Sequence, residues 1–295
     1  MPTVISVVST KGGVGKTTTA ANLGGILADF GMQVLLVDAD VQPSLSKYFE
    51  LPHRAPNGLS SVIRSGGSIL DDAISQTNIP NLHVVCSDAP DGSLQTWLRD
   101  REDRLMILRR AVRNSPAIDK YNVVIIDTQG AVGELQKTAA MAAHIMLSPI
   151  KPDLLSAGEF ASGTLNMLTE LNRLADYGEA FRAGELYALV NDCERTNNSR
   201  EFAAYIRRQF AGHKNVRVLN TQVPHAAAWP TATTQQIPVH QYERRQKNSR
   251  STGAPWTTMH QLVWELFPEL DELYIDDFAH EDSAAKEVRE EGGLA

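Results

Sequence analysis

Short apolar runs recur along the chain, and stretches with helical periodicity separate them. Seven of these runs are rich in aliphatic and β-branched residues: VISVVS (4–9), QVLLVDAD (33–40), LHVVC (82–86), YNVVIID (121–127), HIMLSPI (144–150), LYALVN (186–191) and VRVLN (216–220). Most are apolar at consecutive positions, which is typical of parallel strands buried on both faces. The alternation with helices indicates βαβ units. It predicts an α/β fold: a doubly wound, mostly parallel sheet with helices on both faces and ligands beyond the carboxyl ends of its strands.

The domain organisation follows from the extent of this pattern. No repeat or low-complexity linker interrupts it, so we expect one domain over residues 1–275. Residues 276–295 are polar and acidic and are expected to form a flexible tail. No run approaches the roughly 18 apolar residues of a membrane-spanning helix, and the N-terminus lacks the apolar core of a signal peptide. These features predict a cytoplasmic protein with no membrane partner.

A glycine-rich segment, STKGGVGKTTTAANL (9–23), lies between the first predicted strand and a helical pattern. Such loops bind phosphate through consecutive backbone N–H groups and the dipole of the following helix. Lys16 is placed to reach the β- and γ-phosphates, Thr17 to bind Mg²⁺ and Thr18 to bind the α-phosphate. The loop residues predicted to bind ATP are Lys11, Gly12, Gly13, Val14, Gly15, Lys16, Thr17 and Thr18. The general pattern G-x-x-x-x-G-K-[ST] has a glycine where this chain has Thr10.

Two further predicted strands end in carboxylates. Asp38 and Asp40 end the apolar part of VLLVDADVQPSLS (34–46), and Asp127 ends that of YNVVIIDTQG (121–130). We expect these strand ends to lie beside the glycine-rich loop, where carboxylates suit a site for Mg²⁺ and water. Asp127 is placed to hold Mg²⁺ through water. A solvated strand end is the alternative for Asp38 and Asp40.

The segment KGGVGKTT and these carboxylates resemble the deviant Walker A ATPases of the ParA/MinD family, whose signature is K-G-G-x-G-K-[ST]. The resemblance implies a P-loop ATPase that forms a homodimer sandwiching two ATP molecules. In that family the early lysine, here Lys11, crosses the dimer interface and contacts the nucleotide of the other subunit. A solvated loop lysine with no evident task in its own subunit is the alternative for Lys11.

The resemblance also assigns roles outside the loop. It gives Asp40 the orientation of the attacking water, so the catalytic residues are Lys11, Lys16 and Asp40. It places Asp38 near the Mg²⁺, through water, and Asn191 and Pro224 near the adenine. A simple strand cap remains the alternative for Asn191. The chain departs from the family pattern at Val41, Pro43, Ser44 and Gln129, which leaves the shape of these loops and its effect on turnover open.

Charge is distributed unevenly along the chain, whose net charge is −7. Residues 191–250 contain ten Lys/Arg and four Asp/Glu, whereas residues 265–295 contain two Lys/Arg and eleven Asp/Glu. A basic segment favours non-specific contacts with DNA phosphates. In SREFAAYIRRQF (199–210), Phe202, Ile206 and Phe210 form an apolar stripe by which a helix would dock. The candidate DNA-binding residues are Arg200, Arg207, Arg208, Arg244, Arg245, Lys247 and Arg250; ordinary solvated helix faces are the alternative.

These features favour a ParA-like DNA segregation ATPase, cytoplasmic and associated with the nucleoid. Its ATP dimer is expected to bind DNA non-specifically, and a ParB-like partner to stimulate an otherwise weak, Mg²⁺-dependent hydrolysis. The alternatives are a MinD-like, cargo-positioning or conjugation-accessory ATPase, and a nucleotide-gated adaptor with negligible turnover, against which Asp40 argues. The acidic end of the chain differs from the basic membrane helix of MinD-like proteins. The sequence leaves open the replicon or cargo, the partner's identity and any regulation of DNA binding by the tail.

Overall fold

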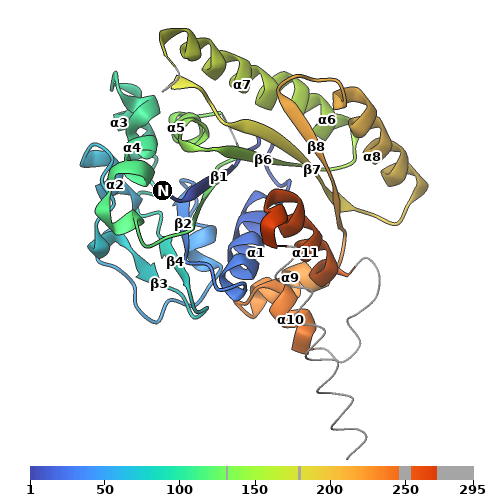
Figure 1. Cartoon of the computed structure of the whole chain (residues 1–295), viewed down its shortest axis with the longest axis horizontal. Helices are drawn as coiled ribbons and strands as arrows, with labels where there is room; N and C mark the ends of the chain where they lie inside the picture. Colours follow the sequence, from blue (N-terminus) through green and yellow to red (C-terminus); the bar gives the residue numbers. More distant parts are fainter. Residues whose placement is uncertain (131, 179–180, 246–253, 271–295) are drawn as a thin grey trace, which may run out of the picture.

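The computed structural model describes residues 1–130, 132–178, 181–245 and 254–270, and places an eight-stranded sheet at its centre (Figure 1). The strands are β1 (Thr3–Val7), β2 (Val34–Ala39), β3 (Ser75–Gln76), β4 (Leu82–Val85), β5 (Val123–Thr128), β6 (Ile145–Ile150), β7 (Glu185–Cys193) and β8 (Val216–Pro224). Their order in the sheet is β3-β4-β2-β5-β1-β6-β7-β8, and only the β3–β4 pair is antiparallel. The predicted doubly wound, mostly parallel sheet is confirmed, with each of the seven predicted strands in it.

Helices cover both faces of the sheet. Within the described ranges they are α1 (Lys16–Asp29), α2 (Leu59–Arg64), α3 (Ser93–Arg99), α4 (Ile107–Asn114), α5 (Glu134–Ala142), α6 (Leu154–Glu159), α7 (Leu165–Asn172), α8 (Asn197–Phe210), α9 (Ala228–Thr234), α10 (Val239–Arg245) and α11 (Pro255–Leu266). Helices α1, α9, α10 and α11 lie on one face and α2 to α8 on the other (Figure 1). None of these helices is long and apolar enough to span a membrane. The proposed tail, residues 276–295, lies outside the described residues.

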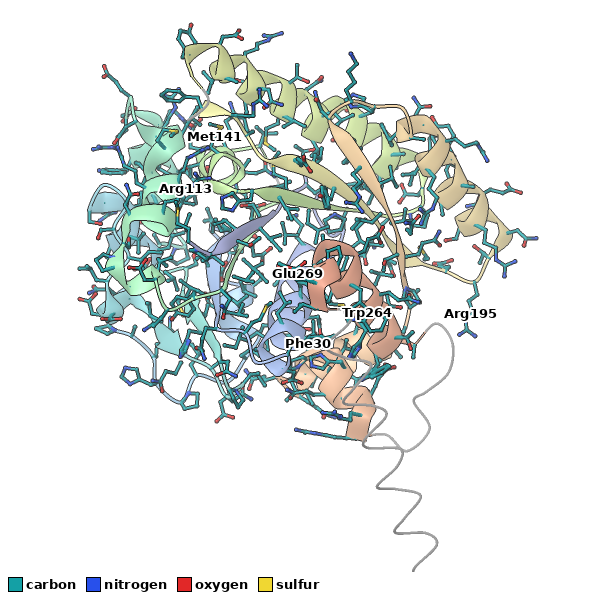
Figure 2. The ribbon with its side chains drawn as sticks, in the orientation of Figure 1. Phe30, Arg113, Met141, Arg195, Trp264 and Glu269 are labelled. Atoms are coloured by element: carbon teal, nitrogen blue, oxygen red, sulfur yellow. The ribbon has the colours of Figure 1, made fainter. Side chains whose placement is uncertain are left out.

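The core explains why the central strands are apolar at every position. Along β2, Val34 and Leu36 pack into the cluster under α1 and α11, whereas Leu35 and Val37 pack into the cluster under α2 to α5. Both faces of the strand are therefore removed from water, as the sequence pattern predicts. Figure 2 shows Trp264 on the α11 side of the sheet and Met141 of α5 on the opposite side.

The winding of the chain creates a crevice at the carboxyl ends of the central strands. From β1 the chain continues to β2, toward the β3 edge of the sheet, whereas from β5 it continues to β6, toward the β8 edge. Ligands of such sheets bind where the winding reverses. Asp38 of β2 is in parallel register with Asp127 of β5, and Asp127 with Val7 of β1. The loop after β1 and the two carboxylates therefore meet at this point.

The sheet ends at β8, where charged side chains from both covering layers bind the strand's backbone. Arg207 of α8 donates to the carbonyl oxygens of Leu219 (2.7 Å) and Asn220 (2.8 Å). Glu265 of α11 accepts from the backbone N–H groups of Asn220 (2.6 Å) and Thr221 (2.9 Å). We call this arrangement the β8 edge clamp. It satisfies backbone groups of residues 219–221, where the pairing of β8 with β7 is irregular and where the described sheet has no strand beyond β8.

Candidate functional site

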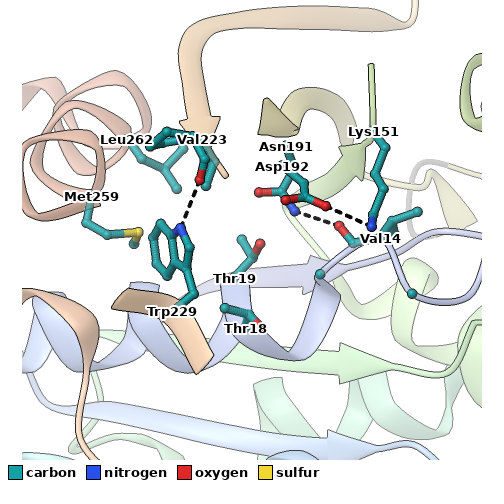
Figure 3. Close-up of a pocket in the computed structure, with 13 residues that line it drawn as sticks. Val14, Thr18, Thr19, Lys151, Asn191, Asp192, Val223, Trp229, Met259 and Leu262 are labelled. Atoms are coloured by element: carbon teal, nitrogen blue, oxygen red, sulfur yellow. Dashed lines mark hydrogen bonds and ion pairs between the residues drawn. The ribbon is translucent and has the colours of Figure 1, made fainter. Parts of the chain in front are cut away.

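The glycine-rich loop joins β1 to α1 and faces a cavity of about 180 Å³ (Figure 3). Gly15, immediately before α1, has φ +92°, a left-handed conformation that favours glycine. A side chain at Gly15 would collide with the amide of Asn191. Gly13, Val14 and Thr18 also line the cavity. The N-terminus of α1 therefore opens onto this cavity with its N–H groups free to bind an anion.

Lys16 is the first residue of α1 and is only 7% exposed. Its Nζ donates to the carbonyl oxygen of Lys11 at 3.3 Å. Burial lowers the pKa of Lys16, and the carboxylates of Asp127 and Asp40 act in the opposite direction. The loop thus holds a desolvated ammonium group that would be stabilised by an anionic ligand, as phosphate binding requires.

Asp127 is fully buried at the end of β5, and neither of its carboxylate oxygens accepts a hydrogen bond of ordinary geometry within the described part of the chain. Burial raises the pKa of Asp127 to about 8; Asp38 adds to the shift, and the Thr17 hydroxyl and Lys16 oppose it. An unpaired buried carboxylate is costly. A divalent cation beside it would remove this cost.

The residues at this point fit Mg²⁺ held jointly with a nucleotide. Mg²⁺ is commonly bound through one or two carboxylates together with substrate phosphates. Asp127 supplies such a carboxylate, and the Thr17 hydroxyl lies beside it. Among the described residues no three His, Cys, Asp or Glu side chains converge as a metal site by themselves. The donor set is therefore suited to a metal that arrives with phosphates.

Asp38 is buried in register with Asp127, but its carboxylate is engaged by its own loop. Oδ2 accepts from the backbone N–H (2.8 Å) and the hydroxyl (2.6 Å) of Ser46, and Oδ1 accepts from the N–H of Asp40 (3.3 Å). Burial raises the pKa of Asp38 to about 6. Asp38 therefore shapes the 40–46 loop in this structure, and its expected place near Mg²⁺ stays a prediction. Ser46, which the sequence analysis did not single out, is its principal partner.

Asp40 lies at the rim of the crevice and is partly exposed. Its Oδ1 accepts from the N–H of Gln42 at 2.9 Å, and its backbone carbonyl accepts from the Ser87 hydroxyl at 2.6 Å. No described residue donates to its Oδ2. Asp40 therefore presents a carboxylate oxygen to solvent beside the phosphate loop, the chemistry expected of a residue that orients water.

Lys11, for which a solvated loop lysine was the alternative, is partly exposed and has partners within its own chain. Its Nζ donates to the hydroxyl of Ser156 at 2.7 Å and lies 3.5 Å from Asp153 Oδ1. Asp153 caps α6 by accepting from the N–H of Ser156 at 2.8 Å. The loop is thereby attached to the start of α6. Contact with a second subunit would require Lys11 to leave Asp153 and Ser156.

The loop after Asp127 lies directly on the phosphate loop. A Cβ added to Gly130 would stand 2.6 Å from the Cα of Gly12 and 3.3 Å from Lys16 Nζ. Gln129, where the family has proline, accepts from Gln95 Nε2 of α3 at 2.7 Å. The departure at Gln129 therefore connects this loop to α3. Because the backbones of Gly12 and Gly130 are in direct contact, a movement of the phosphate loop would displace the loop after Asp127.

One predicted adenine contact, Asn191, has an unexpected role beside the phosphate loop. Asn191 lies inside β7 instead of after it, so the strand-cap alternative is wrong. Its Nδ2 donates to the carbonyl oxygen of Val14 at 2.6 Å, which fixes the phosphate loop from behind. Pro224, the last residue of β8, lines the same cavity. Both predicted residues are therefore at the site, and a contact with adenine stays a prediction.

Other residues of the cavity were missed by the sequence analysis. Trp229 of α9 is the largest, and Met259 and Leu262 of α11 lie behind it. Lys151 follows β6 and forms an ion pair with Asp192 at 2.8 Å (Figure 3). The rule that ligands bind beyond strand ends would have pointed to Lys151, but no sequence pattern indicated that α9 or α11 reaches this cavity.

The candidate DNA-binding residues do not form one face within a chain. Ala203, Ile206 and Phe210 attach α8 to the face of the sheet shared with α7, and Phe202 of the predicted stripe is only partly buried. Helix α10 packs by Val239 on the opposite face. Their exposed arginines, Arg200 and Arg208 on α8 and Arg244 and Arg245 on α10, therefore lie on different sides (Figure 1). Arg207 belongs to the β8 edge clamp, and Lys247 and Arg250 lie outside the described residues.

Comparison with known proteins gives consistent results. A family model described as an AAA domain matches residues 2–177. Chromosome partitioning protein ParA of Caulobacter vibrioides is 33% identical over 148 residues, 50% of this chain and 55% of that protein. Chromosome-partitioning ATPase Soj of Treponema pallidum is 26% identical over 247 residues, 83% of this chain and 91% of that protein. The solved structure of apo McdA from Cyanothece has a TM-score of 0.73 at 20% identity, over 89% of this chain and 100% of that one.

The matches differ in how much of each protein they cover and in sequence identity. The chain spans about half the length of the first curated relatives that it matches. At 20% identity the likeness to McdA concerns the fold. The shared part includes the phosphate loop and the carboxyl ends of β2 and β5, where the geometry above is found.

Proposed function

Because the chain belongs to the AAA-domain family, in its ParA/MinD group of partitioning ATPases, we propose that it is a DNA segregation ATPase. In this proposal it binds Mg²⁺-ATP, forms a homodimer around two nucleotides and binds DNA non-specifically in that state. A ParB-like partner then stimulates hydrolysis and release. We place its activity in the cytoplasm, on the nucleoid.

One observation supports the ATPase chemistry above the others. Asp127 is a buried carboxylate that accepts no hydrogen bond of ordinary geometry from the described residues, and the Thr17 hydroxyl and the buried ammonium of Lys16 are close enough to lower its pKa. Both groups are desolvated, and a nucleotide phosphate with its Mg²⁺ would compensate both charges at once. A loop that served only to pack α1 against the sheet would not need this charge arrangement.

The remaining residues have separate tasks in the proposed reaction. The backbone around Gly13–Gly15 and the N-terminus of α1 bind the phosphates, and Thr17 and Asp127 hold the metal. The bound Mg²⁺ supplies charge compensation on the phosphate oxygens. Asp40 orients a water molecule through the carboxylate oxygen that is open to solvent. Ser46 keeps Asp38, and with it the loop that carries Asp40, in place.

Dimerisation is proposed to use Lys11. In the single chain its ammonium is bound by Asp153 and Ser156, an arrangement that costs little to open because both members of the ion pair are partly exposed. A triphosphate on a second subunit offers a stronger anionic partner than one partly exposed carboxylate. Exchange of Asp153 for this partner would couple nucleotide binding to association.

DNA binding is proposed to use exposed arginines of two helices, α8 and α10. Arg200 and Arg208 of α8 are exposed, and so are Arg244 and Arg245 of α10. Each is suited to phosphate contacts without base recognition. Within one chain the two pairs lie on opposite faces of the sheet, so a common DNA surface would have to form between subunits.

A second candidate is a positioning ATPase of the MinD or McdA type. The observation in its favour is the same separation of the two arginine pairs, because a single chain then offers no continuous cationic face to DNA. Solved structures of MinD and McdA share the fold. In this alternative the nucleotide site works as proposed, and the surface that the dimer recognises differs.

The experiment that tests the proposal is a retention assay on immobilised duplex DNA with ATP, ADP or no nucleotide, run in parallel with anionic vesicles. ATP-dependent retention on DNA of unrelated sequences supports the segregation ATPase. Retention on vesicles alone would favour the MinD type. An Arg200→Ala, Arg208→Ala variant should lose DNA retention, and Arg64→Ala, which removes an exposed arginine from α2 far from α8, serves as a matched control (Figure 1). Equal retention in all nucleotide states would contradict the proposal.

A further inference from the structure

Trp229 is the one aromatic side chain of the described residues that lines the nucleotide cavity. Its position is fixed at both ends. The indole Nε1 donates to the carbonyl oxygen of Pro224 at 2.9 Å, and the backbone carbonyl of Trp229 accepts from the hydroxyl of Thr233 at 2.9 Å. The ring packs against the core cluster under α11. A flat apolar surface is thereby held in a defined place beside the phosphate loop.

Asn191 lies on the other side of the cavity from this ring. Figure 3 shows the indole between Met259 and the threonines at the start of α1, with the Asn191 amide across from it. Asn191 Nδ2 is already committed to the carbonyl oxygen of Val14. Its Oδ1 accepts no hydrogen bond from the described residues. The atom that Asn191 can offer a ligand is therefore an acceptor.

We propose that Trp229 is the stacking wall for the nucleotide base, opposite Asn191, which the resemblance to the ParA/MinD family already places near the adenine, and that Asn191 Oδ1 accepts from the 6-amino group of that base. The inference rests on the proposed function and assigns Trp229 a part in it. A purine placed between the two residues stacks on the indole, and such base–aromatic stacking contributes strongly to affinity. An adenine presents its 6-amino group to Asn191 Oδ1, whereas a 6-oxo purine places an acceptor against an acceptor.

The charge and polarity of the cavity agree with this placement. Its phosphate end is formed by Gly13, Val14 and Gly15 of the loop with the first turn of α1, and its other end by Trp229, Met259 and Leu262. Apolar and aromatic groups at one end and anion-binding groups at the other match the two ends of a nucleotide. If the Asn191 amide rotated to donate its Nδ2 to a 6-oxo group, it would lose its hydrogen bond to the carbonyl oxygen of Val14 and release the loop there.

The test is calorimetric binding of ATP, inosine triphosphate and tripolyphosphate, each with Mg²⁺. Trp229→Ala is expected to weaken ATP binding by roughly 5- to 150-fold and to leave tripolyphosphate binding unchanged, because the latter has no base. Trp229→Phe keeps an aromatic face and should retain most of the ATP affinity. The matched control is Trp97→Ala, which removes an indole of α3 that packs under the guanidinium of Arg101. Wild-type protein should prefer ATP to inosine triphosphate.

Indole fluorescence gives a second readout that does not depend on affinity alone. The chain has four tryptophans, and only Trp229 is expected to respond to ATP. The response should vanish in Trp229→Phe and persist in a Trp97→Phe variant. Melting temperatures establish that each variant is folded.

Two results would overturn the inference while leaving the proposed function intact: wild-type ATP affinity in Trp229→Ala, or an equal loss for ATP and tripolyphosphate. An ATP response that survives in Trp229→Phe would also overturn it. Failure of wild-type protein to bind ATP would instead contradict the proposed function itself, so the two failures are distinguishable.

Discussion

Replacement of Asp127 by asparagine removes a residue of the proposed metal site. Even so, the ligand-free Asp127→Asn protein should become more stable relative to the wild type as the pH rises. The pKa of Asp127 is about 8 in the folded chain, because burial disfavours the carboxylate. An unfolded chain has the ordinary value of about 3.9. Between these values the folded state binds more protons at Asp127 than the unfolded state does. The free energy of unfolding therefore falls as the pH rises through this window.

The magnitude follows from the proton difference. A full proton changes the unfolding free energy by about 1.4 kcal/mol per pH unit. From pH 5 to pH 7 the free energy of unfolding of the wild type should therefore fall by about 2.7 kcal/mol because of this group, and that of Asp127→Asn should not. Asp38, whose pKa is raised to about 6, contributes its own slope to both proteins and largely cancels in the difference.

The assay is urea unfolding of both proteins at pH 5, 6 and 7 without nucleotide. Asp100→Asn, an exposed aspartate at the end of α3, is the control and should follow the wild type at each pH. Addition of Mg²⁺-ADP should stabilise the wild type and not Asp127→Asn. The binding should also release protons at pH 7, seen as a dependence of the calorimetric enthalpy on the buffer, because the metal requires the ionised carboxylate.

Parallel stability curves for the wild type and Asp127→Asn from pH 5 to pH 7 would refute the reasoning. They would mean that Asp127 is ionised in the ligand-free protein at pH 5, held in that form by Lys16 and Thr17 more strongly than burial opposes it. Equal stabilisation of the two proteins by Mg²⁺-ADP would remove Asp127 from the metal site.

Three further predictions concern the reaction and the surface. Lys16→Ala should abolish ATP binding, whereas Lys11→Ala should leave a monomer that binds ATP and does not dimerise; sedimentation with ATP separates the two, and a normal dimer of Lys11→Ala would contradict the proposed exchange with Asp153. Asp40→Ala should bind ATP and DNA but lower turnover by about 100-fold or more in a phosphate-release assay; unchanged turnover would move water orientation elsewhere. Arg208→Ala should flatten the salt dependence of DNA binding by about 0.9 in log K against log salt, whereas Arg207→Ala should instead cost about 1–2 kcal/mol of unfolding free energy; equal salt slopes with equal stabilities would refute both.

The fold was predictable because its central strands carry the signal of burial on both faces. Each run of consecutive apolar residues became a parallel strand. The antiparallel β3 was missed, since Ser75–Gln76 has two residues, of which Gln76 is exposed, and no apolar pattern. The end of β7 was also misjudged: it continues to Cys193 and carries Asn191 within the strand, because pairing with β8 extends beyond the apolar part.

The part of the site that lies within sequence motifs was predictable. Glycines, Lys16 and the strand-end carboxylates lie within the motifs that identify them. The partners of these residues were not predictable, because they come from distant segments: Lys11 meets Ser156 across 145 positions in sequence, and Asn191 meets Val14 across 177. Trp229 reaches the cavity because of where α9 and α11 pack on the sheet. Hydrophobic periodicity predicts that a helix is present but not where along the sheet it packs.

The β8 edge clamp has a consequence for crowding. If the proposed function holds, many copies would come together on one DNA surface, where an open sheet edge would let chains join strand to strand. Arg207 and Glu265 occupy backbone groups in the middle of β8 that such a junction would need. Continuous strand pairing along β8 is thereby interrupted, which favours reversible contacts between crowded copies.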